Sequence, residues 1–276
     1  MPAVPSPIKV SAVSYLNTKP IIYGLENNRL SHRFDIRYDI PSVCAKHLAD
    51  HTVDLALIPS IEYSRIRETI SLFIVPSVAV TSRGEVRSVE LFFNRGLDQI
   101  RTVAVDSSSR TSVALLRIIL GEKFDIQPEL IEMDPNLPNM LSKADAALII
   151  GDNALHYYDA ADNRLDLGEE WNDLTDGLPF VYSFWAGIPD RLNAADVKTL
   201  MDSRDLGLAH IKEISDIYRQ DHAPGQSAGF YEKYLTENIR YELGKEEIEG
   251  LKEYLSYCFY YGLIGEIPEI IFYNME

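Results

Sequence analysis

The chain has 276 residues, which is enough for one large domain or two modest ones. Its 46% hydrophobic and 25% charged residues are typical of a folded globular protein rather than of a disordered chain. The formal net charge of −16 disfavours a partner as anionic as nucleic acid, although salt screening still permits a small anion held by local donors.

Short β-rich runs alternate with helical patterns in the first part of the chain, which is typical of an α/β fold with mainly parallel sheets. We expect extended segments at 8–15, 34–40, 55–60, 71–82 and 89–94, with a short helix at 43–51. Another helix is expected to begin near Pro20, because proline is tolerated in a first helical turn. Asn17 or Thr18 would cap that helix through its side chain.

A second α/β unit begins at Thr102. We expect strands at 102–106, 129–133 and 146–150, a helix from about 111 to 120, and a last extended segment at 179–188. The whole chain after Asn193 is expected to be helical. These elements predict a bilobal molecule with a cleft between its lobes. Residues 1–94 and 184–276 would form the first lobe, and residues 95–183 the second.

The sequence lacks several familiar signals. The amino-terminal MPAVPSPIKV has no basic start followed by an apolar run, and Cys44 and Cys258 do not indicate a disulfide framework, so we expect a cytoplasmic protein. His47 and His51 have a helical spacing that zinc ligands can use, but no third ligand accompanies them. No Walker loop, nucleophile elbow or dinucleotide fingerprint occurs. We therefore expect no metal, no cofactor, and no nucleic-acid or membrane partner.

The loop at 106–112 is rich in hydroxyl groups and lies between an apolar strand and a predicted helix. Ligands of open α/β sheets bind beyond the carboxyl ends of strands, where helix N–H groups favour an anion. The hydroxyl groups of this loop belong to Ser107, Ser108, Ser109, Thr111 and Ser112. The loop therefore predicts a carboxylate or phosphate cradle, and the alternative is an ordinary helix cap rich in serine.

Other polar side chains follow other strands. Ser14, Tyr15 and Asn17 follow the first strand, Ser60 ends the third, Ser82 and Arg83 end the long extended run, and Asp152 follows the strand at 146–150. Each group is either part of a site or a local cap. Asp152 is a candidate base, a ligand acceptor or a helix cap. From the residues alone, we expect a bilobal α/β protein that binds a small carboxylated or hydroxylated anion.

Several segments together resemble the chorismate dehydratase family of the futalosine route to menaquinone. These segments are Val13–Pro20, Val53–Ser60, Val105–Val113, Ala147–Asp152, Asp166–Trp171 and Leu178–Phe180. The resemblance covers roughly residues 8 to 190 and implies the fold of a type II periplasmic binding protein, used here as an enzyme. It also implies a hydro-lyase reaction without a cofactor, in which chorismate loses water to give 3-[(1-carboxyvinyl)oxy]benzoate.

The resemblance suggests roles for the polar side chains. Substrate-binding groups would be Ser107, Ser108, Ser109 and Thr111, which would hold one carboxylate, and Ser14, Tyr15, Ser60 and Arg83 in the other lobe. Asn17 and Ser82 would be catalytic residues that position the hydroxyl or the ring from that lobe. The base is either Asp152 or the enolpyruvyl carboxylate of the substrate itself. Two alternatives remain: a non-catalytic small-anion solute-binding protein, and the sister enzyme that makes 1,4-dihydroxy-6-naphthoate with a histidine base. No histidine lies in the strand-end loops.

Overall fold

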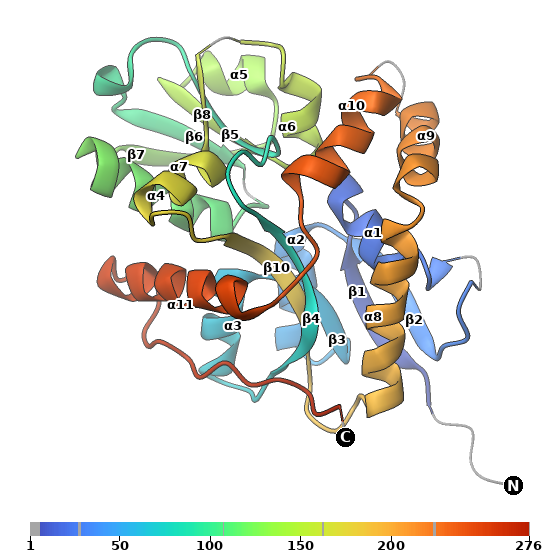
Figure 1. Ribbon diagram of the computed structural model, residues 1–276. Coiled ribbons are helices and arrows are strands. Elements are labelled where there is room, and N and C mark those ends of the chain that lie inside the picture. Colours follow the sequence, from blue (N-terminus) through green and yellow to red (C-terminus); the bar gives the residue numbers. More distant parts are fainter. Residues whose placement is uncertain (1–5, 27–28, 107, 162, 223–224, 276) are drawn as a thin grey trace, which may run out of the picture.

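The structure is a computed structural model that describes residues 6–26, 29–106, 108–161, 163–222 and 225–275. Two five-stranded mixed sheets form the centres of two lobes (Figure 1). The strand order is β2-β1-β3-β10-β4 in the first sheet and β7-β6-β8-β5-β9 in the second. The predicted α/β architecture with two units is therefore confirmed, although both sheets are mixed rather than mainly parallel.

The first sheet contains β1 (Ile8–Val13), β2 (Phe34–Asp39), β3 (Leu55–Pro59), β4 (Phe73–Ser82) and β10 (Phe180–Gly187). Strand β1 pairs in parallel with β2 and β3, whereas β10 runs antiparallel between β3 and β4. All five residues of β3 are buried, as expected of a central strand in a sheet that is covered on both faces. Strand β10 thus returns the chain from the second lobe to the first sheet.

The second sheet contains β5 (Val89–Phe93), β6 (Thr102–Asp106), β7 (Glu129–Met133), β8 (Ala146–Ile150) and β9 (Arg164–Asp166). Strand β6 pairs in parallel with β7 and β8, and β5 runs antiparallel between β8 and β9. The chain therefore passes from one sheet to the other between β4 and β5, and returns between β9 and β10. The lobe boundaries proposed from the sequence, at residues 94 and 183, stay a prediction.

The helices of the two α/β units connect the strands. They are η1 (Leu16–Thr18), α1 (Lys19–Ile22), α2 (Pro41–Ala49), α3 (Ser60–Arg67), η3 (Leu97–Gln99), α4 (Thr111–Phe124), α5 (Leu137–Leu141), α6 (Gly151–Tyr157) and α7 (Leu167–Leu174). Thr18 occupies the N-cap position of α1, as predicted, but its side chain makes no cap hydrogen bond, and Asn17 lies one residue earlier, within η1. The 3-10 turn η1 precedes α1 and already directs the chain into it.

The carboxyl-terminal helices contact both lobes (Figure 1). They are α8 (Ala194–Leu208), α9 (Ile211–Asp221), α10 (Ala228–Lys233), the π-helical turn η4 (Tyr234–Asn238) and α11 (Lys245–Tyr260). Helix α8 packs on α1, where a Cβ at Gly207 would lie 1.9 Å from the carbonyl oxygen of Pro20. At the other lobe, Phe230 of α10 contacts the ring of Tyr158, with 5.5 Å between the ring centroids.

The prediction that the chain is helical throughout after Asn193 is wrong for its last residues. Beyond α11 the chain is irregular, and Phe272 forms a parallel bridge with Ile74 of β4. Gly262, Gly265 and Pro268 disfavour a helix in this segment. Strand β4 lies at the edge of its sheet, so its unpaired backbone groups are available to the returning chain.

Candidate active site

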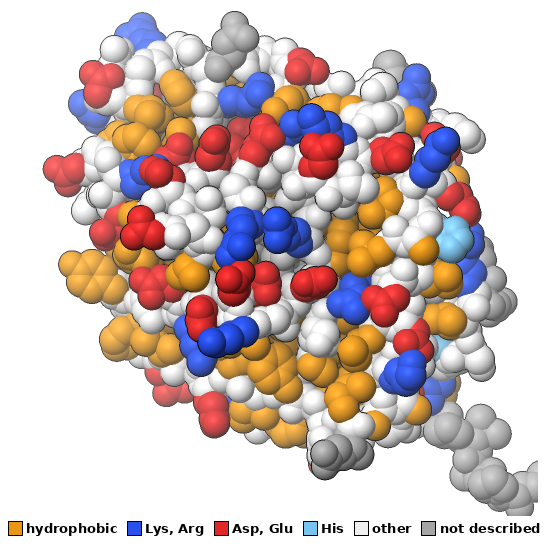
Figure 2. All heavy atoms as spheres, viewed as in Figure 1, with side chains coloured by type: hydrophobic (Ala, Val, Ile, Leu, Met, Phe, Trp, Pro, Cys, Tyr) orange, Lys and Arg blue, Asp and Glu red, His pale blue; other side chains and the backbone are white. Residues whose placement is uncertain are grey.

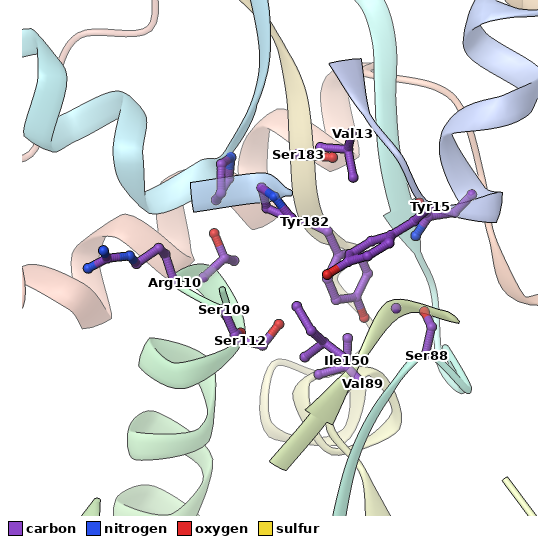
Figure 3. Close-up of a pocket in the computed structure, with 15 residues that line it drawn as sticks. Val13, Tyr15, Ser88, Val89, Ser109, Arg110, Ser112, Ile150, Tyr182 and Ser183 are labelled. Carbon is purple, nitrogen blue, oxygen red and sulfur yellow. The ribbon is translucent and has the colours of Figure 1, made fainter. Parts of the chain in front are cut away.

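A cavity lies between the two lobes, at the ends of strands from both sheets (Figure 3). Its lining includes the described residues Val13, Tyr15, Asn17, Pro41, Pro59, Ser88, Val89, Ser109, Arg110, Thr111, Ser112, Ile150, Gly151, Tyr182 and Ser183. Its volume is about 70 Å³. An engineered cavity of about 150 Å³ accepts benzene, so a larger ring with substituents requires the lobes to part or side chains to rotate.

Tyr15 links the two walls of this cavity. Its ring packs so closely on Gly151 of α6 that a Cβ there would lie 2.6 Å from Tyr15 Cε2. Gly151 has a φ of 61°, which is a conformation that glycine adopts readily. The hydroxyl oxygen of Tyr15 lies 3.4 Å from Ser108 Oγ in the opposite lobe. Burial raises the pKa of Tyr15, so the phenol is neutral and able to donate.

Asn17, from η1, shares the cavity wall with Ser88, which precedes β5. Burial raises the pKa of the adjacent Tyr234, whereas hydrogen bonds to Ser88 and Asn17 oppose that rise. Ser88 and Tyr234 are both buried. Neither residue was predicted from the sequence. Three polar side chains from separate parts of the chain therefore converge at this wall.

The position of Ser88 explains why sequence reasoning missed it. The prediction considered the carboxyl ends of strands, but Ser88 lies at the amino end of β5. Strand β5 is antiparallel to β8, with Val89 opposite Ile150, so its amino end lies beside the carboxyl end of β8. The N–H of Gly151 donates to the carbonyl oxygen of Ser88 at 2.8 Å. Only the strand pairing brings Ser88 to the site.

Strand β10 forms another wall of the cavity and contributes Tyr182, which was not predicted from the sequence. Tyr182 lines the cavity, and its hydroxyl oxygen lies 3.0 Å from the hydroxyl oxygen of Ser82. Ser82 is buried and is not among the lining residues, so its contact with the cavity runs through Tyr182. Burial raises the pKa of Tyr182 well above its usual range, so this phenol is neutral as well.

The serine-rich loop brings Ser109, Thr111 and Ser112 to the cavity. Ser109 Oγ is buried and has no hydrogen-bond partner among the described residues. The Thr111 hydroxyl oxygen accepts from the N–H of Ile61 in the other lobe at 3.3 Å, which leaves its own O–H free to donate. Helix α4 begins at Thr111, and its first N–H groups add donors at the same end.

Two other residues of this loop lie elsewhere. Ser108 donates through its hydroxyl and its N–H to Asp106 Oδ1, at 2.7 and 2.8 Å, and reaches the opposite lobe only through Tyr15. Ser107 lies outside the described residues. The loop therefore presents Ser109, Thr111 and Ser112 to the cavity, while Ser108 supports Tyr15.

Three predicted residues point their functional groups away from this cavity. Ser60 Oγ donates to the carbonyl oxygen of Val181 at 2.5 Å. Arg83 forms an ion pair of 2.5 Å with Glu246 on α11. Ser14 is exposed and lines a separate cavity beside α9.

Asp152 is not among the lining residues either. Its Oδ1 accepts from the N–H of Leu16, at 2.9 Å, across the interface between the lobes. Burial raises the pKa of this carboxyl group, and its hydrogen bonds with the Leu16 N–H and with Tyr218 oppose the rise. The carboxylate therefore holds the turn that carries Asn17.

The cavity suits an anion more than it suits acid–base chemistry by the protein. Its described lining contains hydroxyl, phenol and amide groups and one arginine, but no histidine or carboxylate. Within the described part of the chain, no group of three His, Cys, Asp or Glu residues has a metal-binding arrangement. No helix of that part is both long and apolar enough to cross a membrane. The site is thus built to donate hydrogen bonds.

Comparisons with known proteins agree with this picture. A profile of the family described as menaquinone biosynthesis matches residues 8–260. A chorismate dehydratase from Thermus thermophilus is 29% identical over 261 residues, which cover 87% of this chain and 91% of that protein.

Solved structures show the fold. Protein AF1704 from Archaeoglobus fulgidus has a TM-score of 0.75 at 15% identity, with 93% of this chain and 98% of that chain covered. The periplasmic aliphatic sulphonate binding protein SsuA from Escherichia coli has a TM-score of 0.67 at 14% identity, with 97% and 96% covered. The predicted periplasmic-binding-protein-like fold with a helical carboxyl-terminal segment is confirmed.

Proposed function

The chain belongs to the menaquinone biosynthesis family, and on that premise we propose that it is a chorismate dehydratase. The reaction would remove water from chorismate and give 3-[(1-carboxyvinyl)oxy]benzoate, so the enzyme would be a hydro-lyase. The observation that carries this proposal is that Asn17 of one lobe and Ser109 of the other line the same donor-rich cavity. Chorismate is a dicarboxylate, and such a cavity complements it.

The chemistry defines what the site must supply. The ring carbon that bears the enolpyruvyl ether loses a proton, and the neighbouring carbon loses hydroxide. Because the ether and the hydroxyl are trans, the hydrogen and the hydroxyl leave from the same face, which favours a stepwise path with the proton leaving first. Negative charge then spreads through the diene onto the ring carboxylate. Donors fixed around that carboxylate before the reaction would stabilise the charge.

The serine-rich loop is suited to hold the ring carboxylate. Ser109 has a free hydroxyl, Thr111 retains a free O–H, and the first N–H groups of α4 lie at the same end. Hydrogen bonds to a charged acceptor are about twice as strong as neutral ones. On the opposite wall, Asn17, Ser88 and Tyr182 would orient the ring and donate to the departing hydroxyl.

The base is the second part of the proposal. The described lining contains no carboxylate or imidazole, and Asp152 is engaged with the N–H of Leu16. These observations favour the enolpyruvyl carboxylate of the substrate, folded over the ring, as the group that takes the proton. The proton returned to the departing hydroxide gives water, so the overall reaction balances. Asp152 remains the alternative base.

The first experiment is to incubate the purified protein with chorismate and to follow the aromatic product by absorbance and mass. Turnover that Asn17→Ala and Ser109→Ala both reduce would support the assignment. Tight chorismate binding without turnover would instead identify a non-catalytic solute-binding protein of the same fold. The sister enzyme that forms 1,4-dihydroxy-6-naphthoate is disfavoured, because the described cavity lining contains no histidine.

A further inference from the structure

A second cavity, of about 370 Å³, adjoins the candidate active site. One face of α4 lines it, together with the ends of β6 and β7 and part of α3. The two cavities share two lining residues, Ser109 and Arg110. Figure 3 shows the Arg110 side chain extending away from Tyr15 and Tyr182, which lie across the first cavity. A ligand leaving the first cavity past Ser109 would therefore meet the second.

Three arginines line this second cavity. Arg110 and Arg117 lie two turns apart along α4 and share one face of that helix. Both are exposed, and neither guanidinium group makes a hydrogen bond or an ion pair with any described residue. Arg65, on α3, pairs with Glu62 at 2.7 Å. Two guanidinium groups are thus free to bind an anion.

The acidic residues at this cavity do not neutralise those two groups. Glu132 lines the cavity but is exposed and pairs with neither arginine. Asp106 directs Oδ1 to Ser108, its Oδ2 is buried without a partner among the described residues, and burial raises its pKa. The unpartnered Ser109 Oγ is also available at the boundary between the two cavities.

This arrangement contrasts with the rest of the acidic chain. The formal net charge is −16, and on the face shown in Figure 2 basic side chains lie beside acidic ones. A dianion approaching such a molecule is repelled at long range. A cavity with two unpaired arginines next to the active site offsets that repulsion locally.

We propose that this second cavity is an anion-binding vestibule, in which Arg110 and Arg117 hold a carboxylate of the substrate before it passes Ser109 into the first cavity. The identity of the anion as chorismate rests on the proposed function, whereas the vestibule itself rests on the two arginines and the shared residues. Guanidinium groups suit this role because their planar donors match a carboxylate. The vestibule would raise the rate of association more than it would change the chemical step.

The test uses Arg117→Gln, which alters the vestibule and leaves the lining of the first cavity intact. Arg95→Gln is the matched control, because it makes the same charge change at an exposed arginine. Arg95 follows β5, at the opposite end of the second sheet from the vestibule. The probe is isophthalate, an unreactive aromatic dianion, titrated at about 20 mM and about 500 mM sodium chloride.

At low salt, we expect Arg117→Gln to weaken isophthalate binding about five-fold, since a direct ion pair between exposed groups contributes up to about that much. High salt would remove most of the difference, and Arg95→Gln would match the wild type. The kcat/KM for chorismate would show the same salt-dependent loss. Equal binding by the two variants at low salt, or no isophthalate binding by the wild type, would overturn the vestibule. A wild type that binds isophthalate through Arg117 but does not convert chorismate would overturn only the proposed function.

Discussion

Asp152 Oδ1 accepts a hydrogen bond from the N–H of Leu16 at 2.9 Å, although the two residues are 136 positions apart. Asp152 lies in the first turn of α6 in the second lobe, and Leu16 begins the turn η1 in the first lobe. The contact therefore joins the lobes immediately beside Asn17. Two roles of Asp152 can be tested separately: holding the turn that carries Asn17, and accepting a proton as the catalytic base.

We expect Asp152→Asn to retain kcat for chorismate within about five-fold, because the amide oxygen still accepts from the Leu16 N–H. Asp152→Ala would lower kcat about 10- to 100-fold, because the N–H loses its acceptor and Asn17 its fixed position. Steady-state kinetics of both variants provide the measurement. If Asp152→Asn lowers kcat as much as Asp152→Ala does, while both variants still bind the product, then Asp152 is the base. That result would contradict the positioning role.

Replacement of Gly151 by alanine should damage both stability and the site. A Cβ there would lie 2.6 Å from the Tyr15 ring, in addition to the strain of a φ of 61°. Gly262→Ala is a matched control, since Gly262 has a φ of 67° and an added Cβ would meet no atom within 4 Å. We expect Gly262→Ala to cost about 1 kcal/mol and Gly151→Ala at least about 1 kcal/mol more. Urea unfolding measures the free energies, and equal losses would show that the contact with Tyr15 does not matter.

Glu90 should make the stability of the protein depend on pH. This side chain is fully buried, and its basic neighbour, Arg164, is distant for an ion pair, with 3.9 Å between Arg164 Nε and Glu90 Oε1. Burial, followed by the charge of Asp166, raises its pKa from 4.5 to about 9. Between these values the folded protein keeps a proton that the unfolded chain releases, so the free energy of unfolding falls as pH rises from about 4.5 to 9.

Glu90→Gln removes this titration while keeping the shape of the side chain. Relative to the wild type, we expect its free energy of unfolding to increase with pH by up to about 1.4 kcal/mol per pH unit within that range. Urea unfolding at a series of pH values measures the difference between the two proteins. Asp166, whose pKa burial raises to about 6, interacts with Glu90; well above that pH it is ionised in both proteins, so the difference measured there reports Glu90. Parallel pH profiles would contradict the prediction.

Ser109→Ala should weaken binding without destabilising the fold. The Ser109 hydroxyl is buried and has no partner among the described residues, so its removal breaks no described hydrogen bond. We expect the free energy of unfolding to change by less than about 0.5 kcal/mol, and the Kd for the benzoate product to rise about 10-fold. Ser256→Ala, on an exposed face of α11, is the control. Unchanged product affinity would remove Ser109 from the anion cradle.

Local patterns determined much of the fold. Strands β3 and β8 are continuous apolar runs, and each is buried along its whole length. The hydroxyl-rich loop before α4 was also evident, because its composition and its place between strand and helix are properties of adjacent residues. The same reasoning failed beyond α11, where pairing with the edge of β4 takes the place of a helix.

The elements, the two α/β units and the polar loops could be predicted from the sequence, since periodicity and composition are local quantities. Which groups meet in the site became clear from the folded molecule. Ser88 reaches the cavity because β5 is antiparallel to β8, and Tyr182 because β10 returns to the first sheet. Tyr234 meets Asn17 and Ser88 because the carboxyl-terminal segment packs beside them. Strand direction and the packing of distant segments depend on contacts between residues far apart in the chain, so no local pattern encodes where these hydroxyl groups point.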